Sequence, residues 1–198
     1  MDSQVGILIY SGVSELELGL LLGILKLAGD SAPPTTLARS RASIQGQAGM
    51  VITPHAPLTS TTKLRALLIP GGSGAAKAAR DLLIRDYLRR EPAELLGVSG
   101  SGALLAGEAG LLTGQRVAAS PSLEPQLWIH GPSEVVVAGL CRNPRLLSAS
   151  AGLGAGELAL ALVADLYGEE RAGSIRERLG PGPADALSGA GPTAPPAG

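Results

Sequence analysis

Residues 95–110 read LLGVSGSGALLAGEAG, and this stretch does most to decide the fold. Its first four residues, 95–98, form a short apolar run that is typical of a strand buried on both faces of a parallel sheet. Small residues follow at 99–102, and the pattern after them predicts a helix over residues 102–109 that ends at Gly110. A buried strand, a sharp turn and a helix together form the repeating unit of α/β sheets.

Similar units occur on both sides of this stretch. Strands are expected at residues 5–10 and 65–69, and Ser14 followed by Glu17 fits a capping box that starts a helix over residues 15–28. The other expected elements are weaker strands at 37–43 and 50–53, an amphipathic helix at 81–91, helices at 155–167 and 169–179, and a hairpin whose strands, 134–139 and 146–150, flank a turn at 141–145. Strands that alternate with helices predict a mainly parallel α/β sheet with helices on both faces.

The composition excludes several classes of function. Hydrophobic residues make up 45% of the 198 residues but aromatic residues only 2%, and the net charge is −1. We therefore expect no attraction to nucleic acid or to anionic membranes, and no aromatic platform for single-stranded nucleic acid. The single cysteine, Cys141, excludes an intrachain disulfide framework, and the only histidines are His55 and His130. We expect no metal site and no cofactor.

The two ends of the chain differ from its middle. The N-terminus lacks the positive region of a signal peptide, and the longest apolar run, residues 18–25, is far too short to span a membrane. A cytoplasmic protein is therefore expected. Gly, Pro and Ala fill 15 of the 19 positions in residues 180–198, so we expect a flexible tail there and a folded domain over residues 1–179.

Ligands of such sheets bind outside the carboxyl ends of the strands, which makes the residues after each strand the site candidates. Glu15 and Glu17 follow the first strand, and on a helix they point about 200° apart, so they cannot both face one site. Residues 70–74, PGGSG, follow the second strand. Their glycines allow backbone N–H groups to approach a ligand, but the same residues fit an ordinary strand-to-helix turn.

The third strand end has the geometry of a nucleophile elbow, in which a strand, a sharp turn and a helix follow one another. The N–H groups at the start of such a helix can stabilise an oxyanion. The Gly-x-Ser-x-Gly pattern is not met around Ser99, because Ser101 occupies its last position. No histidine lies nearby in the sequence to act as a general base.

Four blocks of the sequence resemble the ThiJ/PfpI superfamily, also called the Parkinson-disease protein seven superfamily. The resemblance is nearest to the isonitrile hydratase and AraC-sensor branch. It implies the class I glutamine amidotransferase-like fold, a flavodoxin-like three-layer sandwich with a mainly parallel sheet. The blocks are residues 5–29, 66–74, 95–114 and 150–168, and their most specific parts are GALLAGEAGLLTG at 102–114 and SAGLGAGELALALV at 150–163.

The resemblance also implies roles for individual residues. Glu17 matches the family's acid, which supports a cysteine at the elbow. Gly71 and Gly72 match the glycine pair that forms an oxyanion hole together with the N–H after that cysteine. The residues that we expect to bind a ligand or an oxyanion are Gly71, Gly72, Gly100, Ser101, Gly102 and Ser120.

The family's cysteine and histidine are both absent. Counting forward from the strand places the cysteine position at Ser99, whereas counting back from Gly102 places it at Gly100, as if the turn carried an insertion. The histidine position holds Ser120. A thiol can be tuned to a thiolate at a helix N-terminus, whereas a serine hydroxyl needs an adjacent base, and Glu17 is the only candidate.

Three hypotheses follow for the function. The first is a catalytically degenerate family member that keeps a small-molecule or anion pocket at the old active site. The second is a hydratase or hydrolase of small electrophiles that uses Ser99 or Ser101 with Glu17. The third is a regulatory or protein-interaction module. The helix at 18–27 is apolar nearly all round, which favours a homodimer, as family members commonly form, or a helix wholly buried in the monomer.

Overall fold

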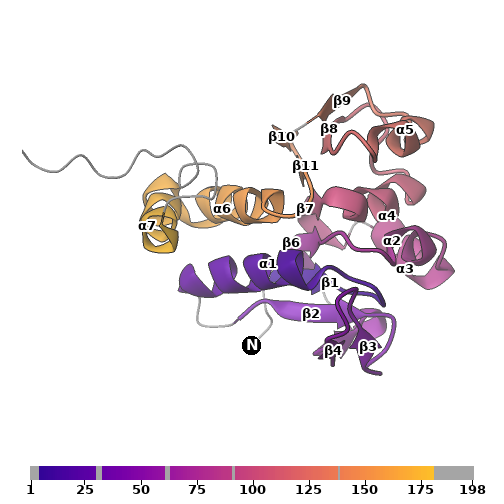
Figure 1. The fold of residues 1–198 in the computed structure, drawn as a ribbon, viewed down its shortest axis with the longest axis horizontal. Coiled ribbons are helices and arrows are strands. Elements are labelled where there is room, and N and C mark those ends of the chain that lie inside the picture. Colours follow the sequence, from indigo (N-terminus) through magenta and orange to yellow (C-terminus); the bar gives the residue numbers. More distant parts are fainter. Residues whose placement is uncertain (1–4, 30–32, 61–62, 91, 138, 181–198) are drawn as a thin grey trace, which may run out of the picture.

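The computed structural model describes residues 5–29, 33–60, 63–90, 92–137 and 139–180. A seven-stranded sheet runs through the centre of this part of the chain (Figure 1). Its strands are β1 (Val5–Leu8), β2 (Thr35–Ala38), β5 (Ala56–Pro57), β6 (Leu64–Ile69), β7 (Ala93–Ser99), β10 (Leu140–Arg142) and β11 (Leu146–Ala149). Their order is β10-β11-β7-β6-β1-β2-β5, and every neighbouring pair is parallel except β10 with β11.

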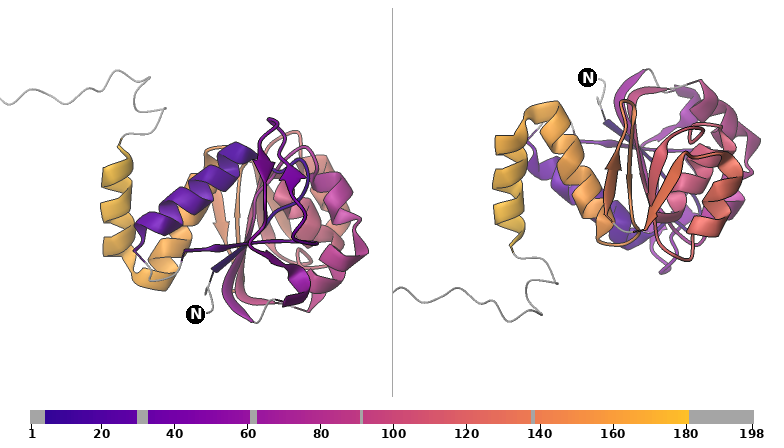
Figure 2. Two further views of the ribbon diagram at one scale, coloured as in Figure 1. Left: turned by 90° about the horizontal axis from the view of Figure 1, so that it is seen from below. Right: turned by 90° about the horizontal axis from the view of Figure 1, so that it is seen from above.

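Helices cover both faces of this sheet. They are α1 (Glu15–Leu27), α2 (Ala75–Ala79), α3 (Leu82–Arg89), α4 (Ala103–Glu108), α5 (Glu124–Leu127), α6 (Gly154–Tyr167) and α7 (Glu169–Leu179), with 3-10 turns η1 (Leu58–Ser60), η2 (Gly100–Gly102) and η3 (Trp128–His130). In both views of Figure 2 the sheet lies between α1 and α6 on one side and α2, α3 and α4 on the other. The predicted flavodoxin-like three-layer α/β sandwich is confirmed.

The core is filled without phenylalanine because small residues let the layers approach closely. The strands β1 and β6 contribute buried Ile and Leu side chains, among them Ile7, Leu67 and Leu68. Gly97 in β7 faces α6, and a Cβ at this position would overlap the Leu68 side chain. The absence of that Cβ gives Leu68 and Leu158 of α6 their space in a close-packed interior.

One of the two hydrogen bonds of the predicted capping box is present at the start of α1. The Ser14 hydroxyl accepts a hydrogen bond of 3.3 Å from the Glu17 N–H, as expected for an N-cap. The Ser14 N–H donates instead to the Gly71 carbonyl at 2.8 Å, so the Glu17 carboxylate is left for other partners. The predicted stop is also present, since the helix ends at Leu27 and Gly29 takes a φ of +84°.

Packing against α6, in the same helix layer, accounts for part of the apolar surface of α1. Leu18, Leu21, Ile24 and Leu25 are buried, and α6 packs alongside the helix. A Cβ on Gly156 of α6 would lie 3.6 Å from the Ile24 side chain, which shows how closely the two helices approach. Contacts within the monomer therefore explain more than one face of this helix.

The predicted hairpin of residues 134–139 with 146–150 was wrong. Strand β9 (Glu134–Val137) pairs in parallel with β8 (Arg116–Ala119), which the sequence analysis missed, in a separate two-stranded sheet. The hairpin joins β10 to β11, so Cys141 lies in a strand and opposite Ser148 rather than in the turn. Short β-branched runs indicate a strand but not its partner, which explains the error.

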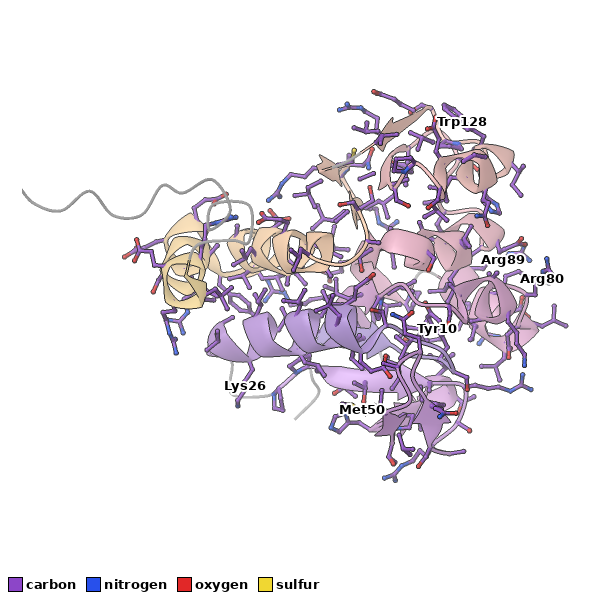
Figure 3. All side chains as sticks on the ribbon, viewed as in Figure 1. Tyr10, Lys26, Met50, Arg80, Arg89 and Trp128 are labelled. Carbon is purple, nitrogen blue, oxygen red and sulfur yellow. The ribbon has the colours of Figure 1, made fainter. Side chains whose placement is uncertain are left out.

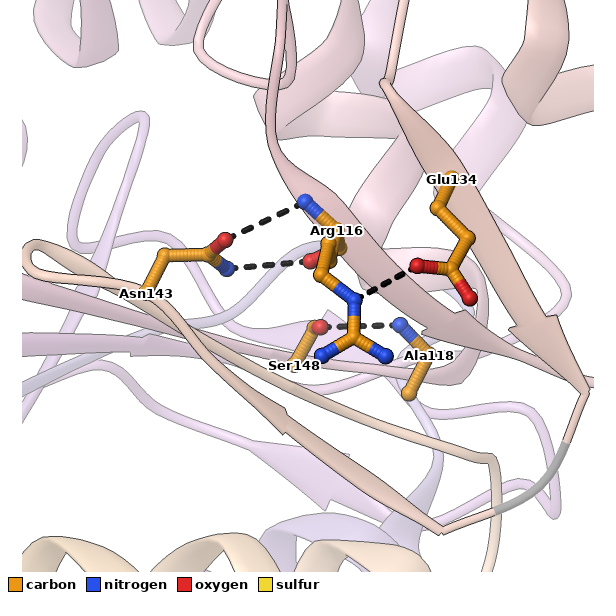
Figure 4. Close-up of polar contacts among 5 residues, drawn as sticks. All are labelled: Arg116, Ala118, Glu134, Asn143 and Ser148. Carbon is orange, nitrogen blue, oxygen red and sulfur yellow. Dashed lines mark hydrogen bonds and ion pairs between the residues drawn. The ribbon is translucent and has the colours of Figure 1, made fainter.

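Hydrogen bonds connect the small sheet of β8 and β9 to the hairpin of β10 and β11 (Figure 4). The Asn143 side chain accepts from the Arg116 N–H at 3.1 Å and donates to the Arg116 carbonyl at 2.9 Å. The Ser148 hydroxyl accepts from the Ala118 N–H at 2.9 Å. Within the small sheet itself, the Arg116 side chain donates to Glu134 at 2.6 Å. Side-chain hydrogen bonds thus satisfy backbone groups that no neighbouring strand reaches.

Several strands have different bounds in the structure from those predicted. The strand expected at 37–43 is Thr35–Ala38, because the chain bends at Arg39, whose side chain turns to Asp81. The strand expected at 5–10 is shorter, at Val5–Leu8. The strand expected at 50–53 is also shorter: it is β4 (Val51–Ile52), which pairs with β3 (Ile44–Gln45).

No helix in the described part of the chain is long and apolar enough to cross a membrane. From residue 181 onward, the expected flexible tail lies outside the described residues.

Candidate functional site

The carboxyl ends of β1, β6 and β7 bring the predicted site residues together. Glu17 is at the centre of the group, buried in the first turn of α1 with 4% of its surface exposed. Its Oε2 accepts from the Gly71 N–H at 2.7 Å and from the Ser99 hydroxyl at 2.6 Å. Its Oε1 accepts from the Gly152 N–H at 3.0 Å. Three donors, one at the end of β7 and two from the loops before α2 and α6, therefore hold this buried carboxylate.

Glu15 points elsewhere, as the spacing of the two acids predicts. Its carboxylate accepts from the Ala48 N–H at 2.9 Å and from the Met50 N–H at 3.1 Å. These backbone hydrogen bonds, that of Ala48 foremost, lower the pKa of Glu15 below its usual value. Glu15 thus fixes the loop between β3 and β4, and Glu17 alone faces the site.

The two candidate positions of the missing cysteine, Ser99 and Gly100, differ in backbone conformation. Ser99 is extended, with φ −124° and ψ 142°, and is fully buried at the end of β7. Gly100 takes a φ of +49° and begins the 3-10 turn η2 that precedes α4. A Cβ on Gly100 would lie 3.3 Å from Glu17 Oε1. The left-handed position that faces the acid is therefore Gly100, whereas Ser99 ends the strand.

The glycines after β6 are required by close backbone contact. Gly72 has a φ of +152°, and a Cβ there would overlap the Gly12 carbonyl. A Cβ on Gly74 would overlap the Ser11 carbonyl, and the Gly74 N–H donates to the Gly12 carbonyl at 3.2 Å. The loops after β1 and β6 thus pack directly against each other, a structural reason for these glycines that involves no ligand.

The two glycine N–H groups of the expected oxyanion hole already have partners. The Gly71 N–H donates to Glu17, and the Gly72 N–H donates to the Ser101 hydroxyl at 2.9 Å. The Ser101 hydroxyl in turn donates to the Gly72 carbonyl at 3.0 Å. An incoming oxyanion would have to displace these internal acceptors.

Ser120 does not join this cluster. Its hydroxyl lies 3.2 Å from that of Ser122, and no hydrogen bond within the described residues connects it to Glu17. Gly102 is buried, and a Cβ there would overlap the Ile69 carbonyl, so it has a packing role. Among the predicted residues, the structure brings together Glu17, Gly71, Ser99 and Gly100 in one group and Gly72 with Ser101 beside it.

The remaining reactive side chains lie in other contacts. His55 Nδ1 lies 2.6 Å from the Thr36 hydroxyl, and the His130 ring occupies the space that a Cβ on Gly107 would need. Burial raises the pKa of the Cys141 thiol, which makes it a poor nucleophile. Within the described ranges, no three His, Cys, Asp or Glu side chains gather as a metal site would require.

Two members of the site were missed by sequence reasoning. Tyr10, which Figure 3 labels in the interior, donates to the Pro70 carbonyl at 2.7 Å. Burial, together with the nearby charge of Glu17, raises the pKa of the Tyr10 hydroxyl far above its usual value. The other is Gly152, whose N–H binds Glu17. It lies in the block at 150–163, so its sequence signal was present without a role attached.

A family model supplies the deciding comparison, since the DJ-1/PfpI family matches residues 3–165. The chain belongs to the DJ-1/PfpI family. The resemblance seen in the sequence is thereby confirmed at the level of the superfamily. No curated protein sequence matches this DJ-1/PfpI chain significantly.

Solved structures of the superfamily share the fold. DJ-1beta of Drosophila melanogaster is 22% identical, with a TM-score of 0.80 over 90% of this chain and 98% of its own. A ThiJ/PfpI family protein of Pseudomonas syringae is 23% identical, with a TM-score of 0.81 over 98% of this chain and 78% of its own. An AraC family transcriptional regulator of Pseudomonas putida is 23% identical, with a TM-score of 0.76 over 89% of this chain and 99% of its own.

Proposed function

We propose that this chain is a catalytically inactive member of the DJ-1/PfpI family that keeps the backbone frame of the old active site. The observation that carries the proposal is the position of Gly100. It occupies the left-handed residue of the elbow, where a Cβ would face Glu17 at 3.3 Å, and it has no side chain to act as a nucleophile. The acid is present, but the group that it would support is missing.

The hydrogen bonds of the site support the same conclusion. Glu17 accepts from Gly71, Ser99 and Gly152, and the Gly72 N–H binds Ser101. Catalysis by an oxyanion hole depends on donors that are free to meet charge as it develops. Here the Gly71 N–H already bonds to the buried Glu17 and the Gly72 N–H to the half-exposed Ser101, so both donors are engaged by the protein itself.

A hydratase or hydrolase that uses Ser99 is the second candidate. The hydrogen bond of 2.6 Å from the Ser99 hydroxyl to Glu17 favours it, because a nucleophile and its base must be within hydrogen-bond reach. Ser99 is fully buried, however, and an attacking hydroxyl must contact its substrate. Ser101 is half-exposed, but its hydroxyl bonds to Gly72 and not to Glu17. We therefore rank this candidate below the inactive protein.

Turnover and labelling experiments separate these two candidates. We expect wild-type protein to convert isonitriles, glyoxals and small amides no faster than buffer, and a serine-reactive phosphonate to leave its intact mass unchanged. The matched variants are Ser99→Ala and, at an exposed serine outside the site, Ser60→Ala. Turnover or a mass adduct that disappears in Ser99→Ala but persists in Ser60→Ala would establish the enzyme instead.

We further propose that any anion still bound by this frame is held at its half-exposed rim. Gly72 and Ser101 are partly accessible, whereas Gly71 is buried and its N–H is committed to Glu17. On addition of acetate, the amide signal of Gly72 should shift in nuclear magnetic resonance spectra and that of Gly71 should not. Ser101→Ala, which removes the internal acceptor, should strengthen the response, and an unchanged Gly72 signal in both proteins would refute rim binding.

A binding or regulatory role is what we propose for an inactive member, and the shared fold with an AraC family regulator supports this role.

We propose that the chain acts as a homodimer through the outer face of α1. Leu16 is 56% exposed there, a Cβ on Gly19 or Gly23 would meet open space, and Leu153 near the start of α6 is 53% exposed. The isonitrile hydratase branch and the cytoplasmic location stay predictions.

A further inference from the structure

A cavity lies beside the Glu17 site, outside the carboxyl ends of β1 and β2. It has a volume of about 450 Å³, within the range of pockets that hold small molecules. Its floor is apolar and includes Ile9, Ala38, Ala78 and Ile84, all buried. Neither Glu17 nor the turn at 99–102 lines it. The carboxyl edge of an α/β sheet is where such folds bind ligands, so this position is suited to a binding site.

The charged side chains at the rim are mainly positive. Arg39, Lys77 and Arg80 line the cavity together with one carboxylate, Asp81, although the whole chain carries a net charge of −1. Asp81 is already engaged, since it caps α3 by accepting from the Leu83 N–H at 2.9 Å and forms an ion pair with Arg39. The carboxylate is therefore not available to neutralise the other two cations.

Lys77 and Arg80 remain as the cations of this rim. Both are exposed, and no ion pair in the described part of the chain involves either of them. They lie in and just after the short helix α2, above the apolar floor. Two positive charges next to a buried apolar surface match a molecule with an acidic head and an aliphatic body.

We propose that this cavity binds a small aliphatic carboxylate, with the acid group on Lys77 and Arg80 and the hydrocarbon body over Ile9 and Ile84. Exposed hydroxyls at the same rim, from Ser11 and Ser40, add hydrogen-bond donors for the head group. The inference does not depend on the loss of catalysis, because neither Glu17 nor the turn at 99–102 lines the cavity, although Tyr10 and Gly74 border both regions. It assigns a binding role to a part of the sheet edge away from Glu17 and the turn at 99–102.

Titration of the full chain with hexanoate tests the proposal, with the isoleucine methyl groups observed by nuclear magnetic resonance. The methyl signals of Ile9 and Ile84 should shift in a saturable manner, whereas that of Ile129, which is 79% exposed outside this cavity, should not. Hexylamine, which has the same chain but a positive head, should cause no saturable shift. A response to hexylamine equal to that of hexanoate would overturn the assignment of an anionic ligand.

The double variant Lys77→Ala with Arg80→Ala should weaken hexanoate binding by about tenfold or more, because two charge-assisted contacts are removed. The control is Lys26→Ala with Arg178→Ala, which removes the same two charges elsewhere and should bind like wild type. Figure 3 labels Lys26 and Arg80 on opposite sides of the molecule. Unchanged affinity in the first variant, or no shift of Ile9 and Ile84 in wild type, would refute the site. Because all four substituted residues are exposed, both variants should fold.

Discussion

The Ser99 hydroxyl donates a hydrogen bond of 2.6 Å to Glu17 Oε2, joining the end of β7 to the first turn of α1 across 82 positions of sequence. Both groups are buried, and the same carboxylate oxygen also accepts from the Gly71 N–H. In an active enzyme of this family, the acid would serve a nucleophile. In this chain it joins the end of β7 to the loops that hold Gly71 and Gly152, so we expect it to be first of all a structural residue.

Replacement of Glu17 should therefore destabilise the fold. Glu17→Ala leaves the donors of Gly71, Ser99 and Gly152 without their acceptor, and we expect a loss of about 2–4 kcal/mol in the free energy of unfolding. The control is Glu157→Ala, which breaks an exposed pair with Arg176 and should cost about 0–1 kcal/mol. Urea unfolding measures both values. Equal values for the two variants would contradict the structural role of Glu17.

The turn at Gly100 should resist any side chain, including the family's cysteine. Gly100→Ala forces a left-handed backbone on an alanine and places its Cβ 2.8 Å from that of Ala151. Gly110→Ala is the matched control, because Gly110 has a φ of +82° and open space around it, and should cost about 1 kcal/mol.

We expect Gly100→Ala to cost about 1–3 kcal/mol more than this control in urea unfolding, because of the added overlap. Adding Ala151→Gly should recover part of the difference. If Gly100→Ala and Gly110→Ala destabilise equally, the overlap with Ala151 is not real.

The two serines of the elbow should differ in their contribution to stability. Ser99→Ala removes a buried hydrogen bond to a carboxylate, for which we expect about 1.5–3 kcal/mol. Ser101→Ala removes a half-exposed hydrogen bond to Gly72 and should cost about 0.5–1.5 kcal/mol. Thermal unfolding ranks the two variants, and amide hydrogen exchange at Gly72 should accelerate only in Ser101→Ala. The reverse ranking would mean that Ser99 does not hold Glu17 as described.

Tyr10 should make the fold sensitive to alkaline pH. The folded state raises the pKa of its hydroxyl by burial and by the charge of Glu17, whereas in the unfolded chain that pKa lies near 10. The neutral hydroxyl therefore contributes fully below pH 10. Above that value the unfolded chain loses the proton first, and stability falls by about 1.4 kcal/mol per pH unit.

Tyr10→Phe removes the ionisable hydroxyl and is therefore the reference protein against which the pH dependence of wild-type stability is measured. Urea unfolding of both proteins between pH 9 and pH 12 should show wild type losing stability more steeply than Tyr10→Phe. Parallel curves would show that Tyr10 ionises in the folded protein as it does in the unfolded chain.

The proposed dimer makes a prediction about mass. Leu16→Glu places a charge on the outer face of α1 and should convert the protein to a monomer, because burying an unpaired charge in an apolar interface is unfavourable. Leu82→Glu changes a similarly exposed leucine on α3 and should leave a dimer. Light scattering after size exclusion at micromolar concentration gives the masses. A monomeric wild type would refute the dimer.

The sequence predicted the regular parts of this fold because their signals are local. The buried strands at β1, β6 and β7, the cap at Ser14 and the glycine stop after α1 follow from short patterns, and each is present. The small sheet of β8 and β9 was missed, and residues 134–139 were assigned a wrong partner. Strand pairing depends on contacts between distant segments, which hydrophobic periodicity does not encode.

The sequence by itself determined that Glu15 and Glu17 cannot both face one site and that glycines surround the strand ends. Its resemblance to the family indicated Glu17 as the acid and implied that the cysteine and histidine are missing. These are properties of residue identity and of helical spacing. Only the tertiary structure showed that Gly100 takes the left-handed conformation whereas Ser99 is extended, since a one-residue shift in a turn changes which Cβ faces the acid. Only the tertiary structure, too, showed that Glu17, Gly71 and Gly72 are already hydrogen-bonded. Loops far apart in the chain supply those partners, and folding alone brings them together.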